Sequence, residues 1–342
     1  MTPRVSIIVP CHNAAPYLAE CLDSLLVQTL REIEILCIDD GSGDETGAIL
    51  RAYAAKDARV QVIAFSENRG VSCARNAGLR AAHGAYIGFC DADDWVDANM
   101  YEALYQAARA LHADGALCAV KKHYSAQRID TVALPWPDGT RFDARGIREE
   151  LIANMLARET DTDALPVSGY TPRNLFRREA LQGHAFREDI HYAEDLLFLV
   201  EALLDAQSFA VVGAAMYHYR FTGTSVTKRY SPYVPESHEK CHAALDEAFA
   251  RAGLDYAARM QIRRRKSAMD AVKNVCLPGT PFAPLARVRK IRAYLRRADV
   301  RALFAPVKLC RISGTLRLKY AMMKYRQSLM LMLFFSYVFK NR

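Results

Sequence analysis

The chain has 342 residues, 51% of them apolar, and a formal net charge of +8. This length suits one large domain with an appendage or two modest domains, and the apolar share excludes a disordered or collagen-like chain. The charge is uneven, because residues 256–342 hold 21 Lys and Arg but only two acids, whereas the rest of the chain is acidic. The basic tail therefore indicates an anionic partner.

The N-terminal residues run directly into a strand pattern, without the long apolar stretch of a secretory signal peptide. We therefore expect the chain to begin in the cytosol. The nine cysteines are odd in number and form no C-x-x-C pair, which argues against a disulfide framework and against a thiolate zinc site. We expect buried free thiols.

Strand-like and helix-like patterns alternate over the first 120 residues. Short apolar runs predict buried strands, and apolar residues at helical spacing predict helices. The predicted strands are Val5–Pro10, Ile33–Ile38, Val60–Phe65, Ala85–Cys90 and Ala116–Val120, and the predicted helices are Ala15–Gln28, Asp44–Lys56, Val71–Ala82 and Asp97–His112. This order predicts an α/β fold, with a mostly parallel sheet flanked by helices on both faces.

Polar clusters follow four of these strands, at Pro10–Asn13, Asp39–Ser42, Glu67–Gly70 and Asp91–Asp94. Ligands of parallel sheets bind outside the carboxyl ends of the strands. We therefore expect the four clusters to line one crevice.

The pattern is less regular from residue 121 to about residue 225 and becomes helical and basic from about residue 233. We predict helices at Leu175–Leu181 and Ala193–Leu204, a strand at Phe209–Arg220, and loops at Asp161–Pro172 and Thr222–Thr227.

The acids Asp91, Asp93 and Asp94 crowd at a predicted strand end. Their repulsion costs on the order of 1 kcal/mol per close pair. A divalent cation removes this cost, and Mn²⁺ and Mg²⁺ prefer carboxylate and diphosphate oxygens. The alternative is a helix N-cap supplied by Asp94 or Asp97.

Three further segments have both a functional and a structural interpretation. Asp40 either recognises a base or ribose or simply belongs to a turn. Arg75 follows a predicted helix start, where it suits a phosphate, but a surface arginine beside a helix cap explains it too. Asp195 opens an apolar helix, as acids commonly do, although a general base requires such a carboxylate.

Together these segments resemble glycosyltransferase family 2, which has the GT-A fold, and the resemblance covers roughly residues 3–225. The motifs, in order, are Val9-Pro10-Cys11-His12-Asn13, Gln28-Thr29, Asp39 to Asp44, Asn68 to Gly78, Asp91 to Trp95, and Glu194 to Phe198. The resemblance implies an inverting transferase that moves a sugar from a nucleotide-sugar, by default a UDP-sugar, to the hydroxyl of a glycan or lipid-linked glycan. Bacterial surface polysaccharide or lipopolysaccharide is the implied product.

The resemblance also implies roles for individual residues. The nucleotide site would comprise Pro10, His12, Asn13, Asp40, Asn68, Arg75 and Asp91. Asp93 and Asp91 would hold Mn²⁺ or Mg²⁺, and Asp195 would be the catalytic base. His218 is a further candidate metal ligand, although a hydrogen-bonded core histidine is the favoured interpretation. His12 stands where the family commonly has Tyr, and Asn174 where it commonly has Lys, which leaves base stacking and acceptor contacts open.

We expect a GT-A domain over residues 1–228, with a nucleotide-sugar half at about 1–120 and an acceptor half at about 121–228. Residues 229–342 would form a basic helical region. Its apolar run Leu329–Phe339, flanked by Lys and Arg, predicts a helix that lies on an anionic membrane surface. The protein would then be peripheral on the inner face of the cytoplasmic membrane. The alternative is a helix packed on the catalytic domain, and no nucleic-acid-binding module is recognisable.

Two other functions stay open at this point. A nucleotidyltransferase would need a Gly-rich, Lys-bearing loop after the first strand, and this sequence has Cys11-His12-Asn13 there. A membrane-tethered, non-catalytic binding protein for glycans or nucleotides would not need the acids, and all of them are present. A dinucleotide oxidoreductase is disfavoured because G-x-G-x-x-G is absent after the first strand.

Overall fold

The structure is a computed structural model that describes residues 2–125, 127–156, 169–221, 229–312 and 314–340. The described residues divide into two compact units. Unit 1 lies within Met1–Ile152 and Pro166–Thr222, and unit 2 lies within Ala153–Leu165 and Gly223–Arg342. Each unit is described by itself below.

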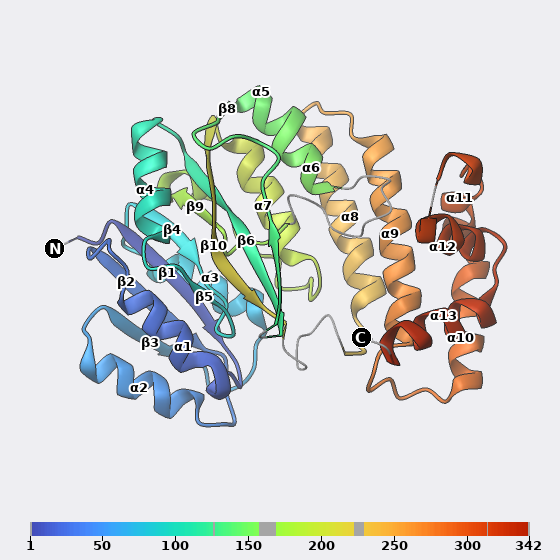
Figure 1. Cartoon of the computed structure of the whole chain (residues 1–342), viewed down its shortest axis with the longest axis horizontal. Helices are drawn as coiled ribbons and strands as arrows, with labels where there is room; N and C mark the ends of the chain where they lie inside the picture. Colours follow the sequence, from blue (N-terminus) through green and yellow to red (C-terminus); the bar gives the residue numbers. More distant parts are fainter. Residues whose placement is uncertain (1, 126, 157–168, 222–228, 313, 341–342) are drawn as a thin grey trace. The chain divides into compact units, whose positions relative to one another are not determined.

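Unit 1 begins with alternating strands and helices (Figure 1). Its first elements are β1 (Val5–Cys11), α1 (Ala15–Leu26), β2 (Ile33–Asp39), α2 (Thr46–Lys56), β3 (Val60–Ala64), α3 (Val71–Ala81), β4 (Tyr86–Phe89), β5 (Trp95–Val96) and α4 (Met100–Ala110). The βαβα order predicted from the sequence is confirmed here. Each predicted strand and helix of this half is present, with ends that shift by a few residues.

The second half of unit 1 adds antiparallel strands. Its elements are β6 (Gly115–Ser125), β7 (Arg128–Val132), β8 (Arg141–Asp143), α5 (Ala144–Gly146), a π-helical turn (Ile147–Ile152), β9 (Asn174–Arg177), a 3₁₀ turn (Arg178–Leu181), α7 (Glu194–Asp205) and β10 (Ser208–Arg220). The strand order is β3-β2-β1-β4-β9-β6-β10-β5, with β7 beside β6 and β8 beside β10. Strand β9 is antiparallel to both of its neighbours, so β6 and β10 run in the same direction as β1 to β4.

Helices cover both faces of this sheet, as expected. On one face of the sheet, the β1 residues Val5, Ile7 and Val9 pack against α1 and α4. The opposite face packs against α3 and α7, where Phe89 and Phe198 meet edge to face. Helix α3 lies very close to the sheet, because a Cβ on Gly78 would come within 2.4 Å of Ile8. This close packing fixes the position of the side chains that α3 presents at the carboxyl edge of the sheet.

One element differs from the prediction. Leu175–Leu181 was expected to be a helix, but its first part is β9, in which Leu175 pairs with Gly88 on one side and Ala116 on the other. A run this short carries no usable periodicity, and pairing with two central strands decides its conformation. The expected loop Thr222–Thr227 and most of the expected loop Asp161–Pro172 lie outside the described residues.

Unit 2 is helical, as expected from residue 233 onward. Its helices are α6 (Ala153–Leu156), α8 (Val234–Arg251), α9 (Ala257–Val275), α10 (Pro284–Arg296), α11 (Ala298–Phe304), α12 (Gly314–Lys324) and α13 (Ser328–Lys340). Buried side chains of α9 to α13 form one core, in which Tyr320, Leu331 and Phe335 anchor the last two helices.

All nine cysteines are free, and eight of them are buried. This confirms the expectation of buried free thiols for every cysteine except Cys310, which is exposed.

Helix α13 has an apolar side that remains exposed. Leu329, Met330, Leu333 and Tyr337 are each at least half exposed. Within the described part of the chain, none of the helices combines the length and apolarity needed to cross a bilayer.

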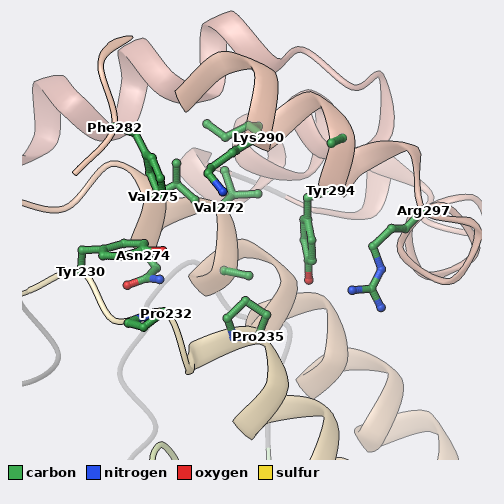
Figure 2. Close-up of a pocket in the computed structure, with 13 residues that line it drawn as sticks. Tyr230, Pro232, Pro235, Val272, Asn274, Val275, Phe282, Lys290, Tyr294 and Arg297 are labelled. Carbon is green, nitrogen blue, oxygen red and sulfur yellow. The ribbon is translucent and has the colours of Figure 1, made fainter. Parts of the chain in front are cut away.

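A cavity of about 500 Å³ lies between α9 and α10 (Figure 2). Its wall is largely apolar and aromatic, and Lys290 Nζ lies 4.3 Å from the centre of the Phe282 ring. Arg297 on its rim is already paired with Glu239 and Asp299.

Candidate active site at the carboxyl edge of the sheet

The turn after β2 is locked to the turn after β3 through Asp40. The Asp40 carboxylate is almost fully buried and accepts hydrogen bonds from the backbone N–H groups of Arg69 (2.6 Å) and Gly70 (2.8 Å). Gly41 has a φ of +63°, and a Cβ there would lie 2.3 Å from the carbonyl carbon of Glu67. Only glycine permits this approach. Asp40 thus holds two of the predicted polar clusters together.

Exposed polar groups from the first cluster surround this turn. His12 Nδ1 donates to the carbonyl oxygen of Asp40 at 2.8 Å, which leaves Nε2 to accept from the Asn13 amide at 3.1 Å. Asn13 also accepts from the N–H of Gly43 at 2.8 Å. Asn68 accepts from the N–H of Gly70 at 3.1 Å, and Pro10 is half-buried at the end of β1. His12, Asn13 and Asn68 are exposed and accessible to a ligand.

Arg75, on α3, joins three motifs that are far apart in the sequence. Its Nη2 lies 3.0 Å from Asp91, and its Nη1 lies 2.5 Å from Asp195 and 3.2 Å from Glu194. Burial alone would lower the pKa of Arg75, but Asp195, Asp91 and Glu194 outweigh it and raise the pKa on balance. The cluster therefore keeps one buried guanidinium charged among three carboxylates. The prediction placed Arg75 toward a diphosphate, and its contacts here are to acids.

Asp195 lies in the first turn of α7, two residues after Ala193. Ala193 has a φ of +67°, a left-handed conformation that is unfavourable for a residue with a side chain. Burial raises the pKa of Asp195 to about 7, Arg75 opposes this effect, and Glu194 and Asp91 add to it. The N–H of Thr171 lies 3.5 Å from its second carboxylate oxygen. A buried carboxylate with a pKa near neutrality is suited to accept a proton.

The three acids after β4 have different environments. Asp94 is fully buried, and it accepts from Tyr217 Oη at 2.5 Å and from the N–H of Arg220 at 2.7 Å. Burial and repulsion from Asp91 raise the pKa of Asp93 to about 6. In the described part of the chain, no cation forms an ion pair with Asp93. Asp94 thus holds the loop onto β10, whereas Asp93 forms no ion pair among the described residues and is only partly compensated by the charge of Arg220.

A second network on β10 includes the remaining metal candidate. His218 Nε2 lies 2.8 Å from Asp97, and its Nδ1 lies 2.9 Å from His123 Nε2. Its ring also stacks on Trp95, with centroids 5.0 Å apart. Both ring nitrogens of His218 therefore have partners in this arrangement.

Sequence reasoning did not identify the residues that support the acid loop. Arg220 donates from Nε to the carbonyl oxygen of Asp93 at 2.9 Å and lies 4.4 Å from the Trp95 ring. The resemblance places the segment Tyr217 to Arg220 near the active site but gives Tyr217 and Arg220 no individual role, and none of its motifs includes His123. Only the pairing of the strands brings these residues together, because β10 runs beside β6 and ends next to the loop after β4.

The residues at this edge fit a divalent cation in part. Asp93 and the oxygen of Asp91 that does not face Arg75 are candidate ligands, and burial together with the charge of Asp91 raises the pKa of Asp93. Among the described residues, no group of three or more His, Cys, Asp or Glu side chains is placed to hold a metal by itself. Such a pair suits Mg²⁺ or Mn²⁺, which commonly take one or two carboxylates and complete their shell with substrate phosphates and water.

A D-x-D acid pair and a distant buried carboxylate, gathered at the carboxyl edge of such a sheet, are the arrangement that the resemblance implied for a glycosyltransferase. The sequence matches the profile of "Glycosyl transferase family 2" over residues 6–182. A relative of nearly equal length, "Uncharacterized glycosyltransferase EpsJ" of Bacillus subtilis (strain 168), is 34% identical over 98% of this chain and 96% of its own length. The chain belongs to glycosyltransferase family 2.

Other similarities agree with this assignment. "Succinoglycan biosynthesis protein ExoO" of Rhizobium meliloti (strain 1021) is 31% identical over 79% of this chain and 75% of its own length. The crystal structure of S. aureus TarS 1-349 in complex with UDP-GlcNAc superposes with a TM-score of 0.65 over 99% of this chain and 92% of that chain, at 19% identity. The predicted GT-A fold is confirmed.

Proposed function

We propose that the protein transfers a hexose or N-acetylhexosamine from a UDP-sugar to a hydroxyl group of a glycan or lipid-linked glycan, with inversion at the anomeric carbon. The product would be a bacterial surface polysaccharide or lipopolysaccharide. The observation that carries the proposal is the Arg75 cluster, which brings Asp91 of the D-x-D pair next to Asp195 from 104 residues further along the chain. The UDP-sugar is favoured by the TarS complex, whose fold this chain shares.

In this proposal each group at the edge has one task. His12, Asn13 and Asn68 contact the nucleotide, and Asp40 keeps their two turns in register. Asp195 accepts the proton of the acceptor hydroxyl, which attacks the sugar from the face opposite the leaving diphosphate. Arg75 holds Asp195 in place. A divalent cation bound by Asp91 and Asp93 would neutralise the diphosphate as it leaves.

We further propose that unit 2 holds the enzyme on the inner face of the cytoplasmic membrane. The exposed apolar side chains of α13 support this, as do the exposed cations Arg317 and Arg326 on and beside α12. Such a helix lies in the interface plane, where basic side chains contact anionic headgroups.

The decisive experiment is a screen of nucleotide-sugars for thermal stabilisation of the purified protein with Mn²⁺, repeated with EDTA. We expect a UDP-sugar to give the largest rise in Tm, and EDTA to remove most of it. Slow hydrolysis of the same donor should also require the cation. Equal stabilisation with EDTA, and no donor turnover, would favour a non-catalytic nucleotide-binding protein. Stabilisation by nucleoside triphosphates alone would favour a nucleotidyltransferase.

A further inference from the structure

Arg173, immediately before β9, is buried without a partner. Its side chain has no exposed surface, and none of its three guanidinium nitrogens forms a hydrogen bond with any residue that the structure describes. Burial lowers its pKa to about 10, and the neighbours that counter this effect are Cys118 and Tyr170 rather than carboxylates. Arginine is almost never fully buried without a partner. This side chain therefore calls for an anion that the described residues do not supply.

A second cation lies nearby on the same face of the sheet. The N–H of Cys118 donates to the carbonyl oxygen of Arg173, which places Arg173 beside β6, and Lys122 lies four residues further along that strand on the same face. Burial and the charge of Arg173 lower the pKa of Lys122. Its Nζ lies 5.5 Å from the centre of the Tyr170 ring and, within the described ranges, forms no ion pair. Asp130, the cross-strand partner of Lys122 on β7, partly compensates the charge of Lys122, so the buried Arg173 is the cation that lacks an acidic neighbour.

This region lies at the carboxyl edge, on the side of Asp195. Because β9 runs opposite to its neighbours, the residue that precedes it lies at the carboxyl end of β4 and beside Cys118, from which β6 continues beyond this edge to Ser125. Thr171, two residues before Arg173, contacts Asp195 through its N–H. Four strand spacings of about 4.8 Å separate β2 from β6, so the strand that carries Lys122 lies about 19 Å across the sheet from the strand that precedes the Asp40 turn. Asp91, which follows β4, lies between the two.

We propose that Arg173 and Lys122 bind an anionic group, a phosphate or a carboxylate, carried by the acceptor. The inference rests on the proposed function, because it assigns the acceptor to the side of Asp195. A guanidinium and an ammonium together can neutralise such a group, and the guanidinium can bind it through two parallel hydrogen bonds.

Tyr170 controls access to this site. Its ring stacks on Tyr219 at 5.3 Å and lies under Lys122. Tyr170 and Lys122 are partly exposed, whereas Arg173 is covered. Tyr170 is also close enough to Arg173 to raise its pKa, so we expect its ring to limit access to Arg173 and Tyr170→Ala to let anions bind more tightly.

The test is thermal unfolding in metal-free buffer of constant ionic strength, with inorganic phosphate, glucose 1-phosphate, glucuronate or neutral glucose added. We expect phosphate compounds or glucuronate, but not glucose, to raise the Tm of the wild type. If the phosphate compounds raise the Tm, the ligand is a phosphate, and if glucuronate raises it, the ligand is a carboxylate. Arg173→Met should abolish the response and, in chloride alone, raise the Tm, since it removes a buried unpaired charge. Lys122→Met should weaken the apparent affinity about tenfold, which is the effect of losing one charge-assisted hydrogen bond.

The control is Arg177→Met, which removes a half-buried arginine of β9 that pairs with Asp114 and should leave the anion response unchanged. If Arg173→Met fails to fold, Lys122→Met and Tyr170→Ala carry the test with opposite expected signs. A rise in Tm with the anion that persists in both Lys122→Met and Arg173→Met overturns the proposal. So does the lack of any such rise in both the wild type and Tyr170→Ala. UDP stabilisation with Mn²⁺ should persist in both cation variants. If UDP with Mn²⁺ does not stabilise the wild type, the proposed function is contradicted. The rise in Tm with phosphate or glucuronate tests the Arg173 site separately.

Discussion

Asp93 and Asp94 are adjacent in the sequence but differ in what surrounds them. Asp94 accepts hydrogen bonds from Tyr217 and from the N–H of Arg220, whereas burial and repulsion from Asp91 raise the pKa of Asp93. At the scale of single residues, we therefore assign Asp94 to stability and Asp93 to cation binding.

Asparagine substitutions separate these roles. In EDTA, Asp93→Asn should leave the Tm unchanged or raise the free energy of unfolding by about 1 kcal/mol, because it removes a repelled charge. The same variant should lose the stabilisation by UDP with Mn²⁺. Asp94→Asn should cost about 1–3 kcal/mol, since one buried donor loses its acceptor. Equal Tm values for the two variants in EDTA would contradict the assignment.

Asp195 should give the transfer reaction a characteristic pH dependence. Its pKa is raised to about 7, so the carboxylate that accepts a proton is depleted below that pH and complete above it. The rate at saturating substrates should rise with pH through about 7 and then level off. Asp195→Asn should lower the rate by about 10²–10⁴-fold, the usual contribution of a general base, and should still bind UDP. A rate that does not change between pH 5.5 and 8.5 would exclude Asp195 as the base.

At the scale of single elements, α13 makes a prediction about membranes. Leu331 and Phe335 anchor it in the core of unit 2, whereas Leu329 and Leu333 point to solvent. The variant Leu329→Gln with Leu333→Gln should keep its Tm and lose binding to vesicles that contain anionic lipid, measured by co-sedimentation. Leu285→Gln, an equally exposed position on α10, is the matched control and should bind as the wild type does. Full binding by the double variant would refute the role of α13.

The elements also explain which predictions succeeded. The strands β1 to β4 are long apolar runs that end in polar turns, and this local pattern predicted both the sheet and the polar clusters at one edge. The prediction for β9 was wrong because its four residues hold no periodicity. Their conformation is fixed by pairing partners about 60 to 90 residues away in the chain. The contacts of Arg75 with Glu194 and Asp195 were likewise out of reach, because they depend on where α7 begins relative to α3. The unpaired Arg173 is a property of packing and has no signature in the sequence.

At the scale of the whole molecule, the two units should respond differently to acid. His238 and His242 on α8 are buried in unit 2, and burial lowers their pKa values to about 3 and about 2. A histidine with a depressed pKa stays neutral in the folded state while the unfolded chain takes up protons below about 6.5, so stability is lost as the pH falls from there. Each of these two histidines should lower the free energy of unfolding of unit 2 by about 1 kcal/mol between pH 7.5 and 5.5.

Unit 2 should therefore unfold first in mild acid. Its Tm should fall from pH 7.5 to 5.5, and His242→Gln should reduce that fall. His83→Gln, on an exposed histidine of unit 1, should change nothing. The measurement is calorimetry at several pH values, and an acid response that His242→Gln leaves intact would contradict this explanation.

The reversal of β9 has a consequence for how such an enzyme can change its specificity. Strands β1 to β4 form a continuous parallel block that holds the nucleotide turns, and β9 begins at the same edge without belonging to that block. If the proposed acceptor site at Arg173 is correct, substitutions just before β9 should alter which molecules are glycosylated and leave the turns after β1 to β4 untouched. New acceptors would then be acquired by exchanging a short stretch of chain, with no redesign of the machinery that activates the sugar.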